Sequence, residues 1–147
     1  MTRKIMPNDI LMGEVTRLVT EGEKVTLLTK GNSMLPFIHG ESDSVLLESP
    51  GELSEDMVVL AEVSQGSYVL HRILAIAGDK VVLMGDGNLK GKEVCRRSDV
   101  KAVAVKIIKP DREVDCMSTD HLFKVRIWKA LLPVRRWILA VYRRLFI

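Results

Sequence analysis

Residues 57–84 read MVVLAEVSQGSYVLHRILAIAGDKVVLM. Within this stretch, three runs rich in Val, Ile and Leu are separated by residue pairs typical of turns, Gln65-Gly66 and Gly78-Asp79. The runs span 57–63, 68–77 and 80–84. Similar runs occur at 24–29, 44–47 and 100–108. Short runs of this kind with no helix between them predict a mostly β fold, built on an antiparallel sheet or a partial barrel.

The sequence on either side of these runs predicts helices. Residues 8–21 carry apolar side chains at spacings of three and four, which is typical of one helix. After Pro110 the β pattern ends, and we interpret 111–120 as a linker. The end of the chain predicts two short helices that Pro133 separates, because proline lacks a backbone donor. We therefore expect an N-terminal helix in 1–22, a β domain in 23–110, and a linker with a basic amphipathic tail in 111–147.

Composition limits the classes of protein and of partner. With 147 residues, 47% of them hydrophobic, the chain is long enough to fold as one domain with its own core. Residues 121–147 hold five Arg, two Lys and no acid, whereas the rest of the chain is net acidic. This tail predicts either a peripheral contact with anionic lipid or packing on the domain or on a second copy. Without a recognised DNA-reading motif, we do not expect nucleic acid as a partner.

Cysteine usage and hydropathy bear on location. Cys95 and Cys116 form neither a metal-ligand spacing nor a disulfide framework, which favours a reducing compartment. No apolar run approaches the roughly 18 residues that a spanning helix needs. We therefore expect a cytoplasmic protein, either soluble or lying on the inner membrane, that needs neither a metal nor a cofactor.

Two residues predict nucleophilic catalysis. Ser33 follows Gly31-Asn32 and precedes Pro36 by three positions, so it is expected on a stiff turn at a strand end. A catalytic serine needs such an exposed position with amides free beside it. His71 lies inside the run 68–77 and can act as a base near neutral pH. The alternatives are an ordinary turn serine and a structural histidine. His39, in a loop near Ser33, is a weaker candidate for the base.

A third element is the turn around Asp86, which lies between Gly85 and Gly87. A carboxylate can orient an imidazole and stabilise its protonated form, so Asp86 is the candidate partner of His71. The same residues are also what a plain hairpin turn requires. Glu93, seven residues later, is an alternative partner for His71.

Three short sequence motifs, or boxes, occur in an order that resembles the type I signal peptidase family and its LexA-type relatives. Along the chain they are Ser33-Met34-Leu35-Pro36, His71-Arg72 and Gly85-Asp86. The resemblance spans about residues 24–109, and the histidine is similar to the base of the family's histidine-using branch. It implies a mostly β fold with the site on the sheet surface. It also implies an acyl-enzyme mechanism, with Ser33 as nucleophile and His71 as base.

By the same resemblance, the substrate is a peptide or an exported-protein precursor that binds as an extended strand, and Met34 lies beside the specificity pocket. The expected function is that of a serine endopeptidase resembling signal peptidase. Two alternatives stay open. One is a non-catalytic module that binds a peptide or a membrane on the same fold, and the other is a LexA-like self-cleaving regulator.

Overall fold

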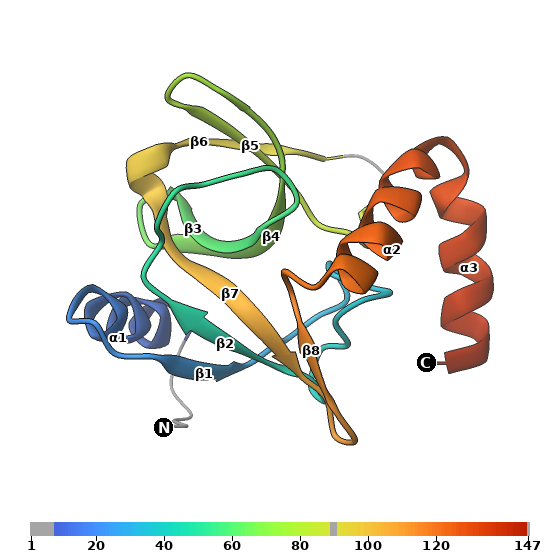
Figure 1. The fold of residues 1–147 in the computed structure, drawn as a ribbon, viewed down its shortest axis with the longest axis horizontal. Helices are drawn as coiled ribbons and strands as arrows, with labels where there is room; N and C mark the ends of the chain where they lie inside the picture. The colour runs from blue at the N-terminus through green and yellow to red at the C-terminus, as the bar shows by residue number, and fades with distance from the viewer. Residues whose placement is uncertain (1–7, 89–90, 147) are drawn as a thin grey trace.

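The computed structural model describes residues 8–88 and 91–146. In this part of the chain eight antiparallel strands form one sheet, in the order β1-β2-β7-β3-β4-β5-β6, with β8 pairing with β7 (Figure 1). Their bounds are β1 Val25–Leu28, β2 Ser44–Glu48, β3 Val58–Ser64, β4 Ser67–Ala77, β5 Lys80–Met84, β6 Glu93–Arg96, β7 Val100–Ile108 and β8 Glu113–Asp115. The expectation of a mostly β, antiparallel fold is confirmed, and β6 and β8 add two short strands to the six expected.

Two apolar clusters form the core of the sheet. The first is covered by α1 (Asn8–Thr20), whose Val15 and Val19 pack against β-strand residues such as Leu47 and Leu60. The second lies between β3, β4, β5 and β7 and contains Ile73 and Leu83, both fully buried. Because the side chains of a strand alternate between two faces, β3 contributes Val58 and Leu60 to the first cluster and Val59 and Ala61 to the second.

The tail forms the expected pair of helices, α2 (Thr119–Ala130) and α3 (Arg135–Phe146). Pro133 lies in the short 3-10 turn between them. Together α2 and α3 form a hairpin at one end of the molecule (Figure 1). Trp128 of α2 and Leu139 of α3 bury themselves against Leu35, which belongs to the loop after β1.

The segment 111–120, which was expected to be a linker, is part of the folded domain. It carries β8, and Cys116 beside this strand is 3% exposed. The Cys116 amide donates to the carbonyl of Val105 at 3.0 Å. Three residues of strand in a polar stretch are too few for alternation to reveal, so the linker interpretation was wrong here. None of the described helices is both long enough and apolar enough to cross a bilayer.

Candidate active site

Ser33 lies in the turn that follows β1, and backbone contacts hold this turn rigidly. The amides of Phe37 and Ile38 both donate to the Met34 carbonyl, at 3.1 and 3.0 Å. Leu35, next to Pro36, is fully buried under the α2–α3 hairpin. The half-buried Ser33 is therefore anchored by the residues on its C-terminal side.

A second turn packs directly against the serine turn. The Gly87 amide donates to the Ser33 carbonyl at 2.8 Å. A Cβ placed on Gly85 would overlap that same carbonyl oxygen, and a Cβ on Gly87 would stand 2.5 Å from the Asn32 carbonyl oxygen. Glycine is needed at both positions because the two backbones approach too closely for any side chain. The Gly85-Asp86-Gly87 box thus acts as a platform under Ser33.

His71 is presented to the same place by β4. Arg72 pairs with Met84 on the neighbouring strand, so His71 stands opposite Gly85, just beyond the end of β5. The position of a Cβ on Gly85 lies 3.1 Å from His71 Nε2. The Ser33 carbonyl oxygen and the His71 imidazole therefore both lie next to Gly85. Within the described residues, Ser33 and His71 line the same cavity, but Ser33 Oγ and the imidazole form no hydrogen bond.

Glu93 is the carboxylate that orients His71. His71 Nδ1 lies 2.6 Å from Glu93 Oε1, and the His71 side chain is buried. Glu93 stands opposite Leu83 of β5, which in turn stands opposite Ile73 of β4, so the contact reaches across β5. A carboxylate at Nδ1 holds the proton on that nitrogen. The lone pair then resides on Nε2, the nitrogen that faces the serine turn.

Asp86 does not orient His71, and the expectation that it does is wrong. Its two carboxylate oxygens accept from Arg72 Nε and Nη2 at 2.8 and 2.7 Å. Both residues are almost completely buried. The physical reason is alternation, because His71 and Arg72 are neighbours on β4 and point to opposite faces of the sheet. Asp86 is on the Arg72 side.

The Arg72–Asp86 pair links the glycine platform to the helical hairpin. Although burial by itself lowers the pKa of the Arg72 guanidinium, the Asp86 carboxylate outweighs burial and raises it overall. Arg72 Nη1 also donates to the Asp56 carbonyl at 2.7 Å. Trp128 Nε1 of α2 donates to the Asp86 carbonyl at 2.7 Å. Asp86 therefore stabilises the site from the face of the sheet opposite His71. Neither Arg72 nor Trp128 was expected to support the site.

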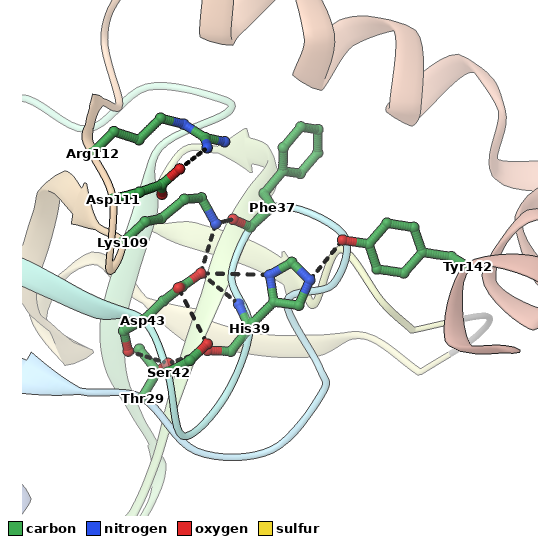
Figure 2. A network of polar contacts seen from close by, with 9 residues as sticks. All are labelled: Thr29, Phe37, His39, Ser42, Asp43, Lys109, Asp111, Arg112 and Tyr142. Atoms are coloured by element: carbon green, nitrogen blue, oxygen red, sulfur yellow. Dashed lines mark hydrogen bonds and ion pairs between the residues drawn. The ribbon is translucent and has the colours of Figure 1, made fainter. Parts of the chain in front are cut away.

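His39, the weaker candidate for the base, belongs to a separate network (Figure 2). Its Nε2 lies 2.6 Å from the Tyr142 hydroxyl on α3, and its amide donates to Asp43 Oδ2 at 2.8 Å. Lys109 Nζ lies 2.6 Å from the same oxygen. Burial alone would raise the pKa of Asp43, but the His39 amide and Lys109 outweigh it and hold the pKa below its ordinary range. This network holds α3 against the loop that follows Ser33.

Ser33 and His71 both line one cavity of about 250 Å³. Met34 also lines it, as do residues 27–31 from the end of β1 and 68–71 of β4. In the order of the described strands β1 is terminal, and the part of β4 before Arg72 pairs with β3 alone. The cavity therefore lies where two strands each have an edge without a partner strand in the described chain.

No protein-family model and no curated protein matches this chain.

The arrangement can therefore be judged only by its own chemistry. Among residues 8–88 and 91–146, the amides of Ser33 and Met34 donate no hydrogen bond, as an oxyanion-binding role would require. In the same part of the chain no group of three His, Cys, Asp or Glu side chains could hold a metal ion. The site thus combines a hydroxyl, an imidazole whose Nδ1 contacts a carboxylate, two backbone amides without a partner among the described residues, and a cavity lined mainly by apolar side chains.

Proposed function

We propose that this chain is a serine endopeptidase resembling the signal peptidase family, with Ser33 as nucleophile, His71 as general base and Glu93 as the group that orients His71. The contact between His71 Nδ1 and Glu93 Oε1 at 2.6 Å carries the proposal, because it leaves Nε2 free to accept a proton on the side of Ser33. A purely structural histidine does not need a free nitrogen beside a serine turn.

The reaction follows from these positions. Ser33 Oγ attacks the carbonyl carbon of the scissile peptide bond while its proton passes to His71 Nε2. The amides of Ser33 and Met34 stabilise the oxyanion of the tetrahedral intermediate. When this intermediate collapses, the C–N bond breaks, the leaving amine takes the proton from Nε2, and an ester on Ser33 remains. His71 then deprotonates a water that hydrolyses the ester.

The cavity is suited to an extended peptide. A substrate strand between β1 and the first half of β4 would pair its backbone with the two strand edges that have no partner strand among the described residues. Leu27, Met34 and Leu70 line this path with apolar surface, next to Ser33 and His71. An exported-protein precursor or a peptide meets these requirements, and the order of the sequence boxes supports a LexA-like and signal-peptidase-like arrangement of the sheet.

A peptide-binding module without catalysis is the second candidate. It is favoured by one observation, the lack of a hydrogen bond between Ser33 and His71 among the described residues, although catalytic contacts often tighten only when substrate binds. Both candidates predict binding of an extended peptide in the cavity. They differ in whether the bound peptide is cut.

A peptide-library digest separates these candidates. The parent chain and the Ser33→Ala variant are each incubated with the library, and new termini are read by mass spectrometry. We expect cleavage by the parent at a recurrent set of sites and none by the variant, while circular dichroism shows that the variant is folded. Peptide binding without cleavage by the parent would support the binding module and contradict the peptidase.

A further inference from the structure

α3 presents an apolar stripe to solvent. Trp137, Val141 and Leu145 are 59% to 68% exposed and are spaced four apart, so they lie along one flank of the helix. Phe146, at the end of the helix, is also exposed. A folded chain gains no stability from leaving such a row of large apolar side chains in water. We therefore expect a binding partner to cover this stripe.

The opposite face of α3 is already used. Leu139 is buried against Trp128 and Leu35, and Tyr142 bonds to His39. The Arg135 guanidinium is buried and donates to the Trp128 carbonyl at 3.2 Å. These contacts fix the rotation of α3 about its axis. The stripe consequently faces outward, on the helix that lies farthest from the sheet (Figure 1).

The flank beside the stripe is basic. Arg136, Arg143 and Arg144 are exposed and, by helical spacing, lie together on the solvent side of α3. The Arg136 guanidinium also stacks over the Trp137 ring, 4.8 Å from its centre. No acidic residue occurs between residues 121 and 147 to offset this charge. A partner that covers both the stripe and its basic flank must therefore be apolar in one part and negatively charged in another.

We propose that α3 docks this chain on an anionic lipid surface, lying in the plane of the interface with Trp137, Val141 and Leu145 in the acyl region. A helix of 12 residues with an apolar flank, a Trp and a basic rim has the chemistry of an interfacial helix. A second copy of the chain is less suitable, because two α3 helices face to face would bring their arginines together. The lipid headgroups supply the negative charge that a second α3 helix lacks.

The two tryptophans make a direct test. Trp128 is buried and Trp137 is exposed, and the chain has no other Trp. On mixing with vesicles of phosphatidylglycerol and phosphatidylcholine, we expect the emission of the parent to shift to shorter wavelength, because only Trp137 changes environment. The Trp137→Phe variant keeps the apolar surface, so it should still sediment with the vesicles but show no shift. Binding without a shift in the parent would place the contact elsewhere and overturn the proposal.

Two triple variants separate the apolar and the charged contributions. Replacing Trp137, Val141 and Leu145 by Ser should abolish co-sedimentation. Replacing Arg136, Arg143 and Arg144 by Gln should lower the bound fraction about tenfold or more on anionic vesicles. The matched control replaces three exposed lysines in or next to the sheet, Lys24, Lys80 and Lys106, by Gln and should bind as the parent does.

Three outcomes would overturn the proposal. One is that the parent remains in the supernatant with anionic vesicles. Another is that the lysine control loses as much binding as the arginine variant, since general charge would then explain the binding. The last is that the parent is a dimer in light scattering and the Ser triple variant is a monomer, because a second copy would then cover the stripe.

Discussion

His71 and Glu93 lie on β4 and β6, which β5 separates, and yet their side chains meet with Nδ1 and Oε1 2.6 Å apart. The contact is possible because β5 ends at Met84, so that Gly85, without a side chain, stands opposite His71. The imidazole is thus held at the point where the second turn passes under Ser33.

Glu93→Gln should slow acylation of Ser33 by a serine-directed probe about 100-fold or more, because the amide can no longer stabilise the imidazolium. Rescue by a conservative variant gives a readout that a purely structural role would not change. Glu93→Asp keeps a carboxylate, so it should acylate faster than Glu93→Gln. An unchanged rate in a folded Glu93→Gln variant would remove Glu93 from the mechanism.

Asp86→Asn should mainly affect stability. The Arg72–Asp86 pair is buried and bidentate, and removing one partner of such a pair costs about 3–5 kcal/mol in the free energy of unfolding. Asp111→Asn is the control, because Asp111 forms an exposed ion pair with Arg112 that should contribute less than about 1 kcal/mol. Urea unfolding measures both. Equal effects of the two variants would contradict the structural role of Asp86.

The sequence allowed much of the fold to be predicted. The runs that became β3, β4 and β5 have both the apolar residues and the turn pairs that mark a strand, and Pro133 marked the break between α2 and α3. β6 (EVCR) and β8 (EVD) have too few residues for alternation to distinguish them from a loop. Short strands of this kind form because they can hydrogen-bond to the edge of a neighbouring strand. The local sequence does not show whether such an edge is available.

The candidate site was predictable to a similar degree. Ser33 and His71, which the sequence paired, line one cavity, but the carboxylate that contacts His71 is Glu93 and not the favoured Asp86. The signal for the error was present in the sequence, because the residue after His71 is an arginine inside an apolar strand. A buried Arg72 requires an acidic partner on its own face of the sheet, which leaves another acid for His71. Whether that acid is Glu93 depends on the register of β5 and β6, and the sequence does not specify the register.

Gly85→Ala should disable the site. Its methyl group would overlap the Ser33 carbonyl oxygen and stand 3.1 Å from His71 Nε2, so the serine turn or the imidazole must move. We expect the acylation rate to fall by about 100-fold or more, since small displacements of reacting groups have effects of this size. Gly13→Ala in α1 is the control, because its methyl group would meet no atom within 4 Å. That variant should acylate normally and gain about 0.5–1 kcal/mol of stability.

The stability of the chain should fall in mild acid because of His121. Burial lowers the pKa of this imidazole, and the nearby charge of Arg72 lowers it further. The unfolded chain then binds more protons, so the contribution of His121 is complete above its unfolded pKa of about 6.5 and is lost as the pH falls through the lower, folded value. His121→Gln should therefore show a smaller drop in the free energy of unfolding between about pH 7.5 and about pH 5.5. An identical drop in parent and variant would contradict this assignment.

The central claim is that His71 activates Ser33, and intact-mass spectrometry of the chain after reaction with a serine-directed phosphonylating probe tests it most directly. The account predicts a single adduct on the parent and on Ser54→Ala, which lacks an exposed loop serine, and a much slower adduct on His71→Ala. It predicts no adduct on Ser33→Ala. A parent that stays unmodified, or a Ser33→Ala variant that reacts as fast as the parent, would contradict it.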